Sequence, residues 1–222
     1  EMCIRDRERT VAVADGVVYY LGNDGVYAFD GSMPVCVSRA LGDKRYTGGV
    51  AGGESGRYWL SAVDAAGETE LLVYDTQKRL WHRQDNTAAV AFARWNGEMT
   101  VLCSDGRLLD TSGTLGTAET GFSWSAESGD LGLYTPEHKY LSRLELRLKT
   151  AAGSTVKAYV CYDGDNVWEQ VGGVSGEAGQ TRGAVLQVRP RRCGHLRLKL
   201  AGDGPCRVYS AAAVYEKGSD GP

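Results

Sequence analysis

Alternating apolar and polar residues divide the first half of the chain into three similar segments. Each opens at a glycine, and the spacings are 40 and 41 residues: Gly16, Gly56 and Gly97. Each then runs through an apolar strand, a polar turn and a second apolar strand to a closing aspartate: Asp30, Asp75 and Asp110. Asp-Gly and Asn-Gly steps between apolar runs are strong hairpin signals. A period near 40 residues with short paired strands predicts the blades of a β-propeller.

The same pattern places short strands at 11–13, 17–21, 26–29, 57–63, 70–75, 80–83, 89–95, 99–103 and 107–110. Residues 33–48 are expected to hold one short strand and a loop, which can form a helical turn over 38–41. Three segments are fewer than the four to eight blades of a complete propeller. We therefore predict a partial propeller over residues 9–110, with further blades supplied upstream or by a partner.

Residues 111–121 contain little that is large and apolar, and they are predicted to form a linker. The 40-residue period stops there. Seven alternating segments follow, at 122–127, 141–149, 155–162, 167–171, 184–189, 195–200 and 207–215. A period of two buries one face of each strand. Residues 122–217 are thus predicted to form an antiparallel β-sandwich of the jelly-roll type, and the fold class is all-β.

The composition supports this all-β organisation and limits the classes of partner that the chain is expected to bind. The chain has 30 glycines in 222 residues, which suits many tight turns. Residues 1–121 carry a net charge of −5 and residues 122–222 one of +2, so neither half is basic enough to indicate specific nucleic-acid binding. No apolar run is long enough to span a membrane. Residues 1–8 are charged and lack alternation, and we expect them to be a non-native prefix to a protein that begins further upstream.

The sequence presents no catalytic or metal-binding motif. Its six cysteines form no CxxC pair, and its three histidines are scattered. We therefore assign no catalytic residue, no metal and no cofactor, and expect the protein not to be an enzyme. The cysteines are expected to be free thiols, most of them buried.

One turn offers candidate ligand-binding residues. Asp163 and Asp165 lie between two predicted strands, where aspartate is a common turn residue and, alternatively, an oxygen ligand for calcium. The missing remainder of a calcium loop favours the turn. Trp168 follows directly, and it is a candidate for stacking on a sugar or, alternatively, for packing in the sandwich.

The densest basic run is a candidate for contact with an acidic partner surface or a phosphate backbone: Arg189, Arg191, Arg192, Arg197 and Lys199. The alternative, which we favour, is that these side chains and Pro190 protect an edge strand from stray pairing.

Three passages together resemble virion structural proteins of tailed bacteriophages and prophages: VVYYLGNDGVYAFDG, ELLVYDTQKRLWHRQD and the region from YLSRLELRLKT to HLRLKLAGDG. The resemblance is to propeller-bearing tail or nozzle components that end in a β-sandwich. It implies a non-enzymatic subunit of a homo-oligomeric ring that contacts portal, adaptor or tail proteins. It also implies a place in the virion, after assembly in the cytoplasm of a bacterial host.

Two other functions remain open. Trp168 and the Asp-Gly turns suit a carbohydrate-binding or glycan-cleaving protein, because propellers and jelly rolls both occur in proteins that bind or cleave carbohydrates. A repeat protein of a bacterial surface or scaffold is the third hypothesis.

Overall fold

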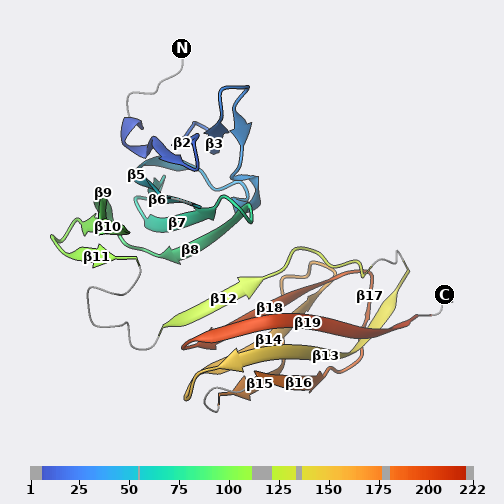
Figure 1. The fold of residues 1–222 in the computed structure, drawn as a ribbon. Coiled ribbons are helices and arrows are strands. Elements are labelled where there is room, and N and C mark those ends of the chain that lie inside the picture. The colour runs from blue at the N-terminus through green and yellow to red at the C-terminus, as the bar shows by residue number, and fades with distance from the viewer. Residues whose placement is uncertain (1–6, 55, 112–121, 134–136, 177–180, 219–222) are drawn as a thin grey trace. The chain divides into compact units, whose positions relative to one another are not determined.

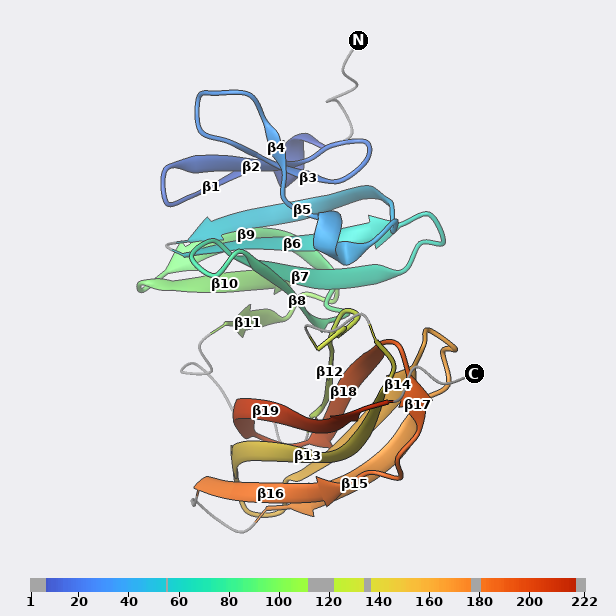
Figure 2. The ribbon, with the colours of Figure 1, turned by 90° about the vertical axis from the view of Figure 1, so that its right-hand side faces the viewer.

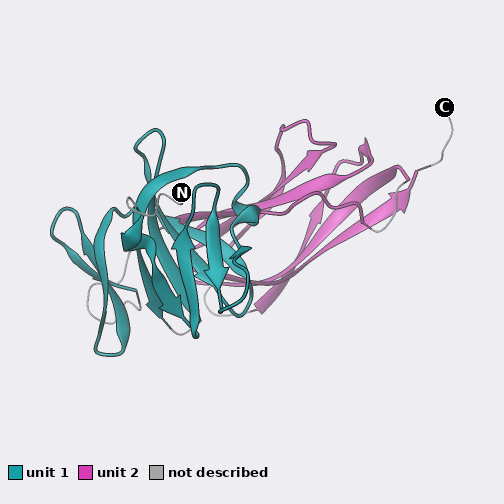
Figure 3. Cartoon of the chain, turned by 90° about the horizontal axis from the view of Figure 1, so that it is seen from above, with its two compact units in different colours: residues 1–118 teal, residues 119–222 magenta. Residues whose placement is uncertain are grey.

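The structure is a computed structural model, which describes residues 7–54, 56–111, 122–133, 137–176 and 181–218. It is all-β and divides into two compact units, residues 1–118 and 119–222 (Figures 1 and 3). The division falls inside the segment predicted to be a linker. Residues 112–121 of that linker and residues 1–6 of the expected prefix lie outside the described residues. None of the helices in the described part is long and apolar enough to cross a membrane.

The described residues of the first unit form three antiparallel sheets, each made of consecutive strands. The first sheet has the order β1-β2-β3-β4, over Ala12–Ala14, Val17–Leu21, Val26–Phe29 and Val35–Cys36. The second has the order β5-β6-β7-β8, over Tyr46–Glu54, Arg57–Asp64, Thr69–Asp75 and Leu80–Asp85. The third has the order β11-β10-β9, with β9 Ala89–Trp95, β10 Glu98–Cys103 and β11 Leu108–Asp110. Two 3-10 helices, Glu8–Thr10 and Arg39–Leu41, accompany them.

The three repeated glycines occupy equivalent turns. Gly16, Gly56 and Gly97 have φ angles of 79°, 78° and 88°, and each closes the first hairpin of its own sheet. Only glycine adopts this region without a steric cost from Cβ. The repeat read from the sequence is therefore a repeat of hairpins in space.

The second sheet lies between the first and the third (Figure 2). Its middle strands β6 and β7 are buried on both faces. One face contributes Tyr58 and Leu72 to a core shared with the first sheet, which includes Tyr19. The other contributes Trp59 and Val73 to a smaller core shared with the third sheet. An apolar sheet face is thus covered by the next sheet along the chain.

Strand β5 corrects the prediction of a loop up to residue 48. It begins at Tyr46 and contains four glycines, which reduce the strand propensity of the segment. A Cβ added to Gly53 would lie 2.0 Å from the carbonyl oxygen of Val13 in β1, and one added to Gly52 would lie 2.5 Å from Cβ of Phe92 in β9. These glycines therefore allow the first strands of the three sheets to come close together.

The second unit is a sandwich of two antiparallel sheets. One has the order β12-β18-β14-β15, over Ser123–Glu127, Leu196–Asp203, Thr155–Tyr162 and Glu169–Ser175. In the other, β13 lies between β16 and β19, and β17 pairs beside it: Lys139–Thr150, Thr181–Gln187, Cys206–Lys217 and Arg192–Cys193. All seven predicted strands are present, and β17 is the addition. Leu144, Leu146 and Leu148 from β13 form the core with Val160 and Leu196 from the opposite sheet.

Candidate functional site

The candidate site is built around the hairpin loop that joins β14 to β15. Three residues of this loop have positive φ angles, Asp163 at 48°, Gly164 at 71° and Asn166 at 57°. Asp, Asn and Gly tolerate this region better than other residues do. The loop chemistry thus turns the chain sharply and brings Trp168 back beside the end of β14.

The two aspartates of the loop accept hydrogen bonds from backbone amides. The N–H groups of Gly194 and His195 donate to Oδ1 of Asp163 at 2.7 and 3.1 Å, which ties the loop to the start of β18. The N–H of Val167 donates to Oδ1 of Asp165 at 2.9 Å and holds the pKa of that carboxyl below its ordinary value. Both carboxylates therefore shape the loop.

Trp168 lies against two basic side chains of β18. The guanidinium carbon of Arg197 is 5.2 Å from the ring centroid, and Nζ of Lys199 is 5.3 Å from it. Both distances fall within the range of a cation–π contact. The indole is half-buried as a result. We name Trp168, Arg197 and Lys199 the Trp168 cluster.

Polar neighbours orient the two cations of the cluster. Arg197 donates to Oδ1 of Asn166 at 2.7 Å and to Sγ of the buried Cys161 at 3.4 Å. Nζ of Lys199 forms an ion pair with Oε1 of Glu127 at 3.2 Å. Sequence reasoning missed Asn166 and Glu127 as partners, and for Glu127 no local signal exists, since its contact follows from the pairing of β12 with β18.

Arg191 forms a second group next to the cluster. It pairs with Glu169 at 2.9 Å and with Asp165 at 3.5 Å, and its guanidinium carbon lies 5.2 Å from the ring centroid of Tyr162. Burial raises the pKa of Tyr162 to about 12. The structure therefore brings Arg191, Asp165 and Glu169 together in one exposed ion-pair network.

Two residues of the basic run do not lie on an edge strand. Arg197 and Lys199 belong to β18, which is hydrogen-bonded on one side to β12 and on the other to β14. The prediction of edge protection is wrong for these two residues, because strand neighbours are set by long-range pairing that alternation does not reveal. Arg189 and Arg192 are exposed and take no part in the contacts described above.

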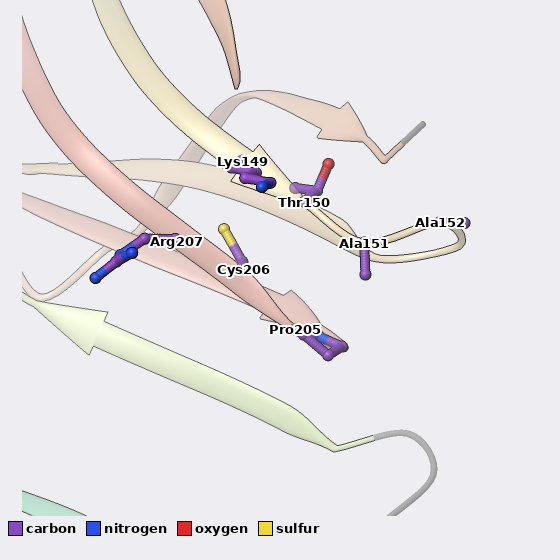
Figure 4. A pocket seen from close by; sticks show the side chains of 7 residues that line it. All are labelled: Lys149, Thr150, Ala151, Ala152, Pro205, Cys206 and Arg207. Atoms are coloured by element: carbon purple, nitrogen blue, oxygen red, sulfur yellow. The ribbon is translucent and has the colours of Figure 1, made fainter. Parts of the chain in front are cut away.

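Three surface hollows lie away from the predicted site residues. One of about 500 Å³ lies where β13 ends and β19 begins (Figure 4), lined by Lys149, Thr150, Ala151, Ala152, Pro205, Cys206 and Arg207. A second of about 620 Å³ lies between the first and second sheets, next to Tyr19 and Tyr74. The third, of about 380 Å³, is on the outer face of β13 and β16 beside Arg147 and Val185. The Trp168 cluster is thus a surface feature outside these hollows.

The described residues contain no group of three or more histidine, cysteine or acidic side chains placed to hold a metal ion. The five cysteines in the same ranges are free thiols, and three of them, Cys103, Cys161 and Cys193, are buried.

Comparisons with known proteins leave the family open. No family model matches the chain, and no curated protein does. Among solved structures, the chain overlaps an exo-β-1,3-galactanase from Phanerochaete chrysosporium with galactose, with a TM-score of 0.26 and 10% identity, over 87% of this chain and 65% of that one. It overlaps another structure, described as a glycoside hydrolase, with a TM-score of 0.27 and 11% identity, over 88% and 68% of the two chains. The chain therefore spans about two thirds of the length of these proteins. At such TM-scores neither similarity carries an argument about fold or activity.

Proposed function

We propose that this chain is a structural subunit that acts by protein–protein assembly, with its three stacked sheets serving as blades of a partial β-propeller. The consecutive order of strands within each sheet supports the propeller assignment. So does the proximity of the first strands, since β5 contacts both β1 and β9. In a propeller, the first strands of successive blades lie side by side along the axis.

The second unit is, in this proposal, a jelly roll, with eight described strands in two sheets. Among the described strands, five of the seven connections from β12 to β19 cross from one sheet to the other, and two, from β14 to β15 and from β16 to β17, stay within a sheet. Such crossing is typical of a jelly roll, which has eight strands in two sheets. Strand β19 lies at an edge of its sheet, because among the described strands it pairs only with β13.

The assembly proposal is based on exposed apolar side chains on the two outer faces of the three-sheet stack. Val13 of β1 is 56% exposed, and it shares its face with Val18 and Phe29. On the third sheet, Trp95 and Leu108 are 65% and 68% exposed. Within the stack, equivalent faces are covered by a neighbouring sheet. Exposed apolar faces of this kind mark protein interfaces.

Sedimentation velocity on the purified chain tests the proposal. We expect association that depends on concentration, and weaker association after Leu108→Asp or Val13→Asp. The matched control is Val185→Asp, which alters an exposed valine on β16 of the second unit. A wild-type chain that stays monomeric at every concentration, or a control that weakens association equally, would count against assembly through these faces.

The virion context of this assembly rests on the resemblance of the sequence to tailed-phage tail or nozzle proteins. It specifies a ring of identical subunits bound to portal, adaptor or tail proteins in a particle built in the bacterial cytoplasm. Electron microscopy of the chain mixed with such proteins from the same genome tests it. Rings or joined complexes are expected, and free particles of unassembled chain would contradict it.

Binding of an acidic carbohydrate is the second candidate, and the Trp168 cluster is the observation that favours it. An aromatic ring beside two cations can offer stacking and charge to one ligand. Binding to acidic and neutral glycans, compared for wild type, Trp168→Ala and the exposed-tryptophan control Trp95→Ala, tests this function. Selective loss of acidic-glycan binding in Trp168→Ala is expected, and equal binding by all three proteins would exclude it.

A further inference from the structure

Strand β19 is a long edge strand with one free side. It spans the twelve residues Cys206–Lys217, and among the described strands it pairs only with β13. Figure 2 shows it as the outer strand of its sheet, beside β13, with β16 on the other side of β13. An unpaired edge presents a row of backbone N–H and C=O groups that can accept another strand. Proteins usually shorten, charge or cover such edges, whereas the middle of this one is Ser210-Ala211-Ala212-Ala213.

The core-facing side of β19 is also uncovered. Val208 is paired with Leu148 and Tyr215 with Leu141, and both leucines are fully buried. Val208 and Tyr215 nevertheless remain 39% and 36% exposed. The sandwich is therefore open along this edge, and a strand placed there would cover apolar side chains as well as backbone groups.

We propose that the strand that fills this position is β19 of a second copy of the chain, paired antiparallel about a two-fold axis at Ala212. The two four-stranded sheets would become one continuous eight-stranded sheet. The interface is isologous, so every contact occurs twice. The occupant is identified by the sequence of β19, which is complementary to itself when it is read outward from Ala212 with Tyr209 left unpaired in a bulge.

The pairs that this register creates match in size and charge. Ala211 lies opposite Ala213 of the second copy, and Ser210 lies opposite Val214. Farther out, Val208 meets Tyr215, and Arg207 meets Glu216. Opposite charges and β-branched–aromatic pairs are favourable cross-strand neighbours. Small alanines at the axis let the two backbones approach.

A bulge already present in β19 places the two residues of each proposed pair on the same face of the sheet. In its pairing with β13, Ser210 is opposite Arg147 and Val208 is opposite Leu148, so Tyr209 is an extra residue. With the same bulge on the free edge, Val208 and Tyr215 both face the core, and Arg207 and Glu216 both face outward. Without it, one end of the strand would place apolar residues opposite charged ones, since neighbouring residues alternate between faces.

The hollow at the start of β19 adds room at the end of the proposed interface (Figure 4). Cys206 and Pro205 line it, and Cys206 would lie opposite Lys217 of the second copy. The incoming strand therefore ends beside an open space of about 500 Å³ rather than against packed side chains.

Charge reversal tests the register by sedimentation velocity. Glu216→Arg places Arg207 opposite an arginine, and Arg207→Glu places a glutamate opposite Glu216. Each is expected to weaken dimerisation about tenfold or more, because two attractive pairs become two repulsive ones. A mixture of the two variants, like the double variant, restores opposite charges and is expected to dimerise as wild type does. The control Lys157→Glu makes the same charge change at an exposed position of β14 and should leave dimerisation unchanged.

Disulfide trapping provides a second readout. Ala212→Cys places two thiols opposite each other at the axis, at a separation that a disulfide spans. Rapid formation of a covalent dimer is expected, and Val185→Cys is the exposed control on β16. Failure of the mixed variants to dimerise, or equal cross-linking of both cysteine variants, would overturn the proposal. So would a wild-type monomer in which every β19 amide is already protected from hydrogen exchange, because the edge would then be filled within one molecule.

This proposal is independent of assembly through the stacked sheets. Loss of association in Leu108→Asp but not in Glu216→Arg would remove the β19 dimer and leave the proposed function standing. The reverse result would remove only the contact between stack faces.

Discussion

Replacing Gly53 with alanine should open the junction between the first two sheets. Gly53 lies in β5, and a Cβ at this position would be 2.0 Å from the carbonyl oxygen of Val13 and 2.6 Å from its carbonyl carbon. Contacts below 3.0 Å essentially never occur at a real Cβ, so β1 must move away by about 1 Å. The obstacle is backbone, which cannot rotate aside as a side chain does.

The cost follows from what β1 holds in place. Ala14 of β1 is buried in the core that the first sheet shares with the second. Overpacking typically costs about 1–3 kcal/mol, and a backbone obstacle places Gly53→Ala near about 3 kcal/mol. For a domain of this size each kcal/mol lowers the melting temperature by roughly 4–8 °C, so a fall on the order of 10 °C or more is expected. Differential scanning calorimetry measures it, and hydrogen exchange assigns the affected transition to the first unit.

Gly48→Ala is the matched control in the same strand. No atom lies within 4 Å of its Cβ position, and its φ angle is not positive. Alanine there should leave stability unchanged or raise it by up to about 1 kcal/mol, because it restricts the unfolded chain. If the two variants melt at the same temperature, the close approach of β1 to Gly53 is not a constraint on this fold.

Three other substitutions test separate contacts. Asp15→Ala removes the carboxylate that accepts hydrogen bonds from the Gly56 N–H at 3.0 Å and the Thr76 hydroxyl at 2.6 Å. We expect it to lower the free energy of unfolding of the first unit by about 1–3 kcal/mol, measured by urea denaturation. In the wild-type protein, Nζ of the buried Lys139 donates a hydrogen bond to the carbonyl oxygen of Gly132 at 2.7 Å. Lys139→Met removes this donor and should destabilise the second unit by a similar amount in the same assay. Burial alone would raise the pKa of Glu70, but the Tyr46 hydroxyl and the cations of Lys44 and Arg83 lower it. The ionised Glu70 carboxylate therefore stabilises the folded state fully above its unfolded pKa of about 4.3, and this stabilisation is lost as the pH falls. We expect Glu70→Gln to flatten the acid side of the stability–pH curve.

Much of the fold could be predicted because its turns are local. Asp15-Gly16 and Asn96-Gly97 form hairpins with positive φ angles at both positions, as their sequences predict. Asp75 caps the turn after β7 by accepting the N–H groups of Gln77 and Lys78. Neither feature needs information from distant residues. The alternating strands of the second unit were equally accessible, since one face of each is buried in a single core.

The features missed by the sequence depend on distant neighbours. The glycines of β5 argue for a loop by propensity, and only the close approach of Val13 and Phe92 explains why glycine occupies a strand there. Likewise, Trp168 could be chosen as a candidate, but its contacts with Arg197 and Lys199 follow from the pairing of β14 with β18. Residue type identified the candidate, and sheet register determined its surroundings.

Strand β19 shows why both kinds of information are needed. Its sequence is nearly complementary to itself, with Arg207 and Glu216 equidistant from the boundary between Ala211 and Ala212. Regular antiparallel pairing about that boundary would place a core-facing alanine opposite an outward-facing one, because side chains alternate strictly along a strand. The bulge at Tyr209 shifts one end of the strand by a residue and removes this conflict. The charges predict a self-pairing strand, and the irregularity in the sheet determines the register in which that pairing is sterically consistent.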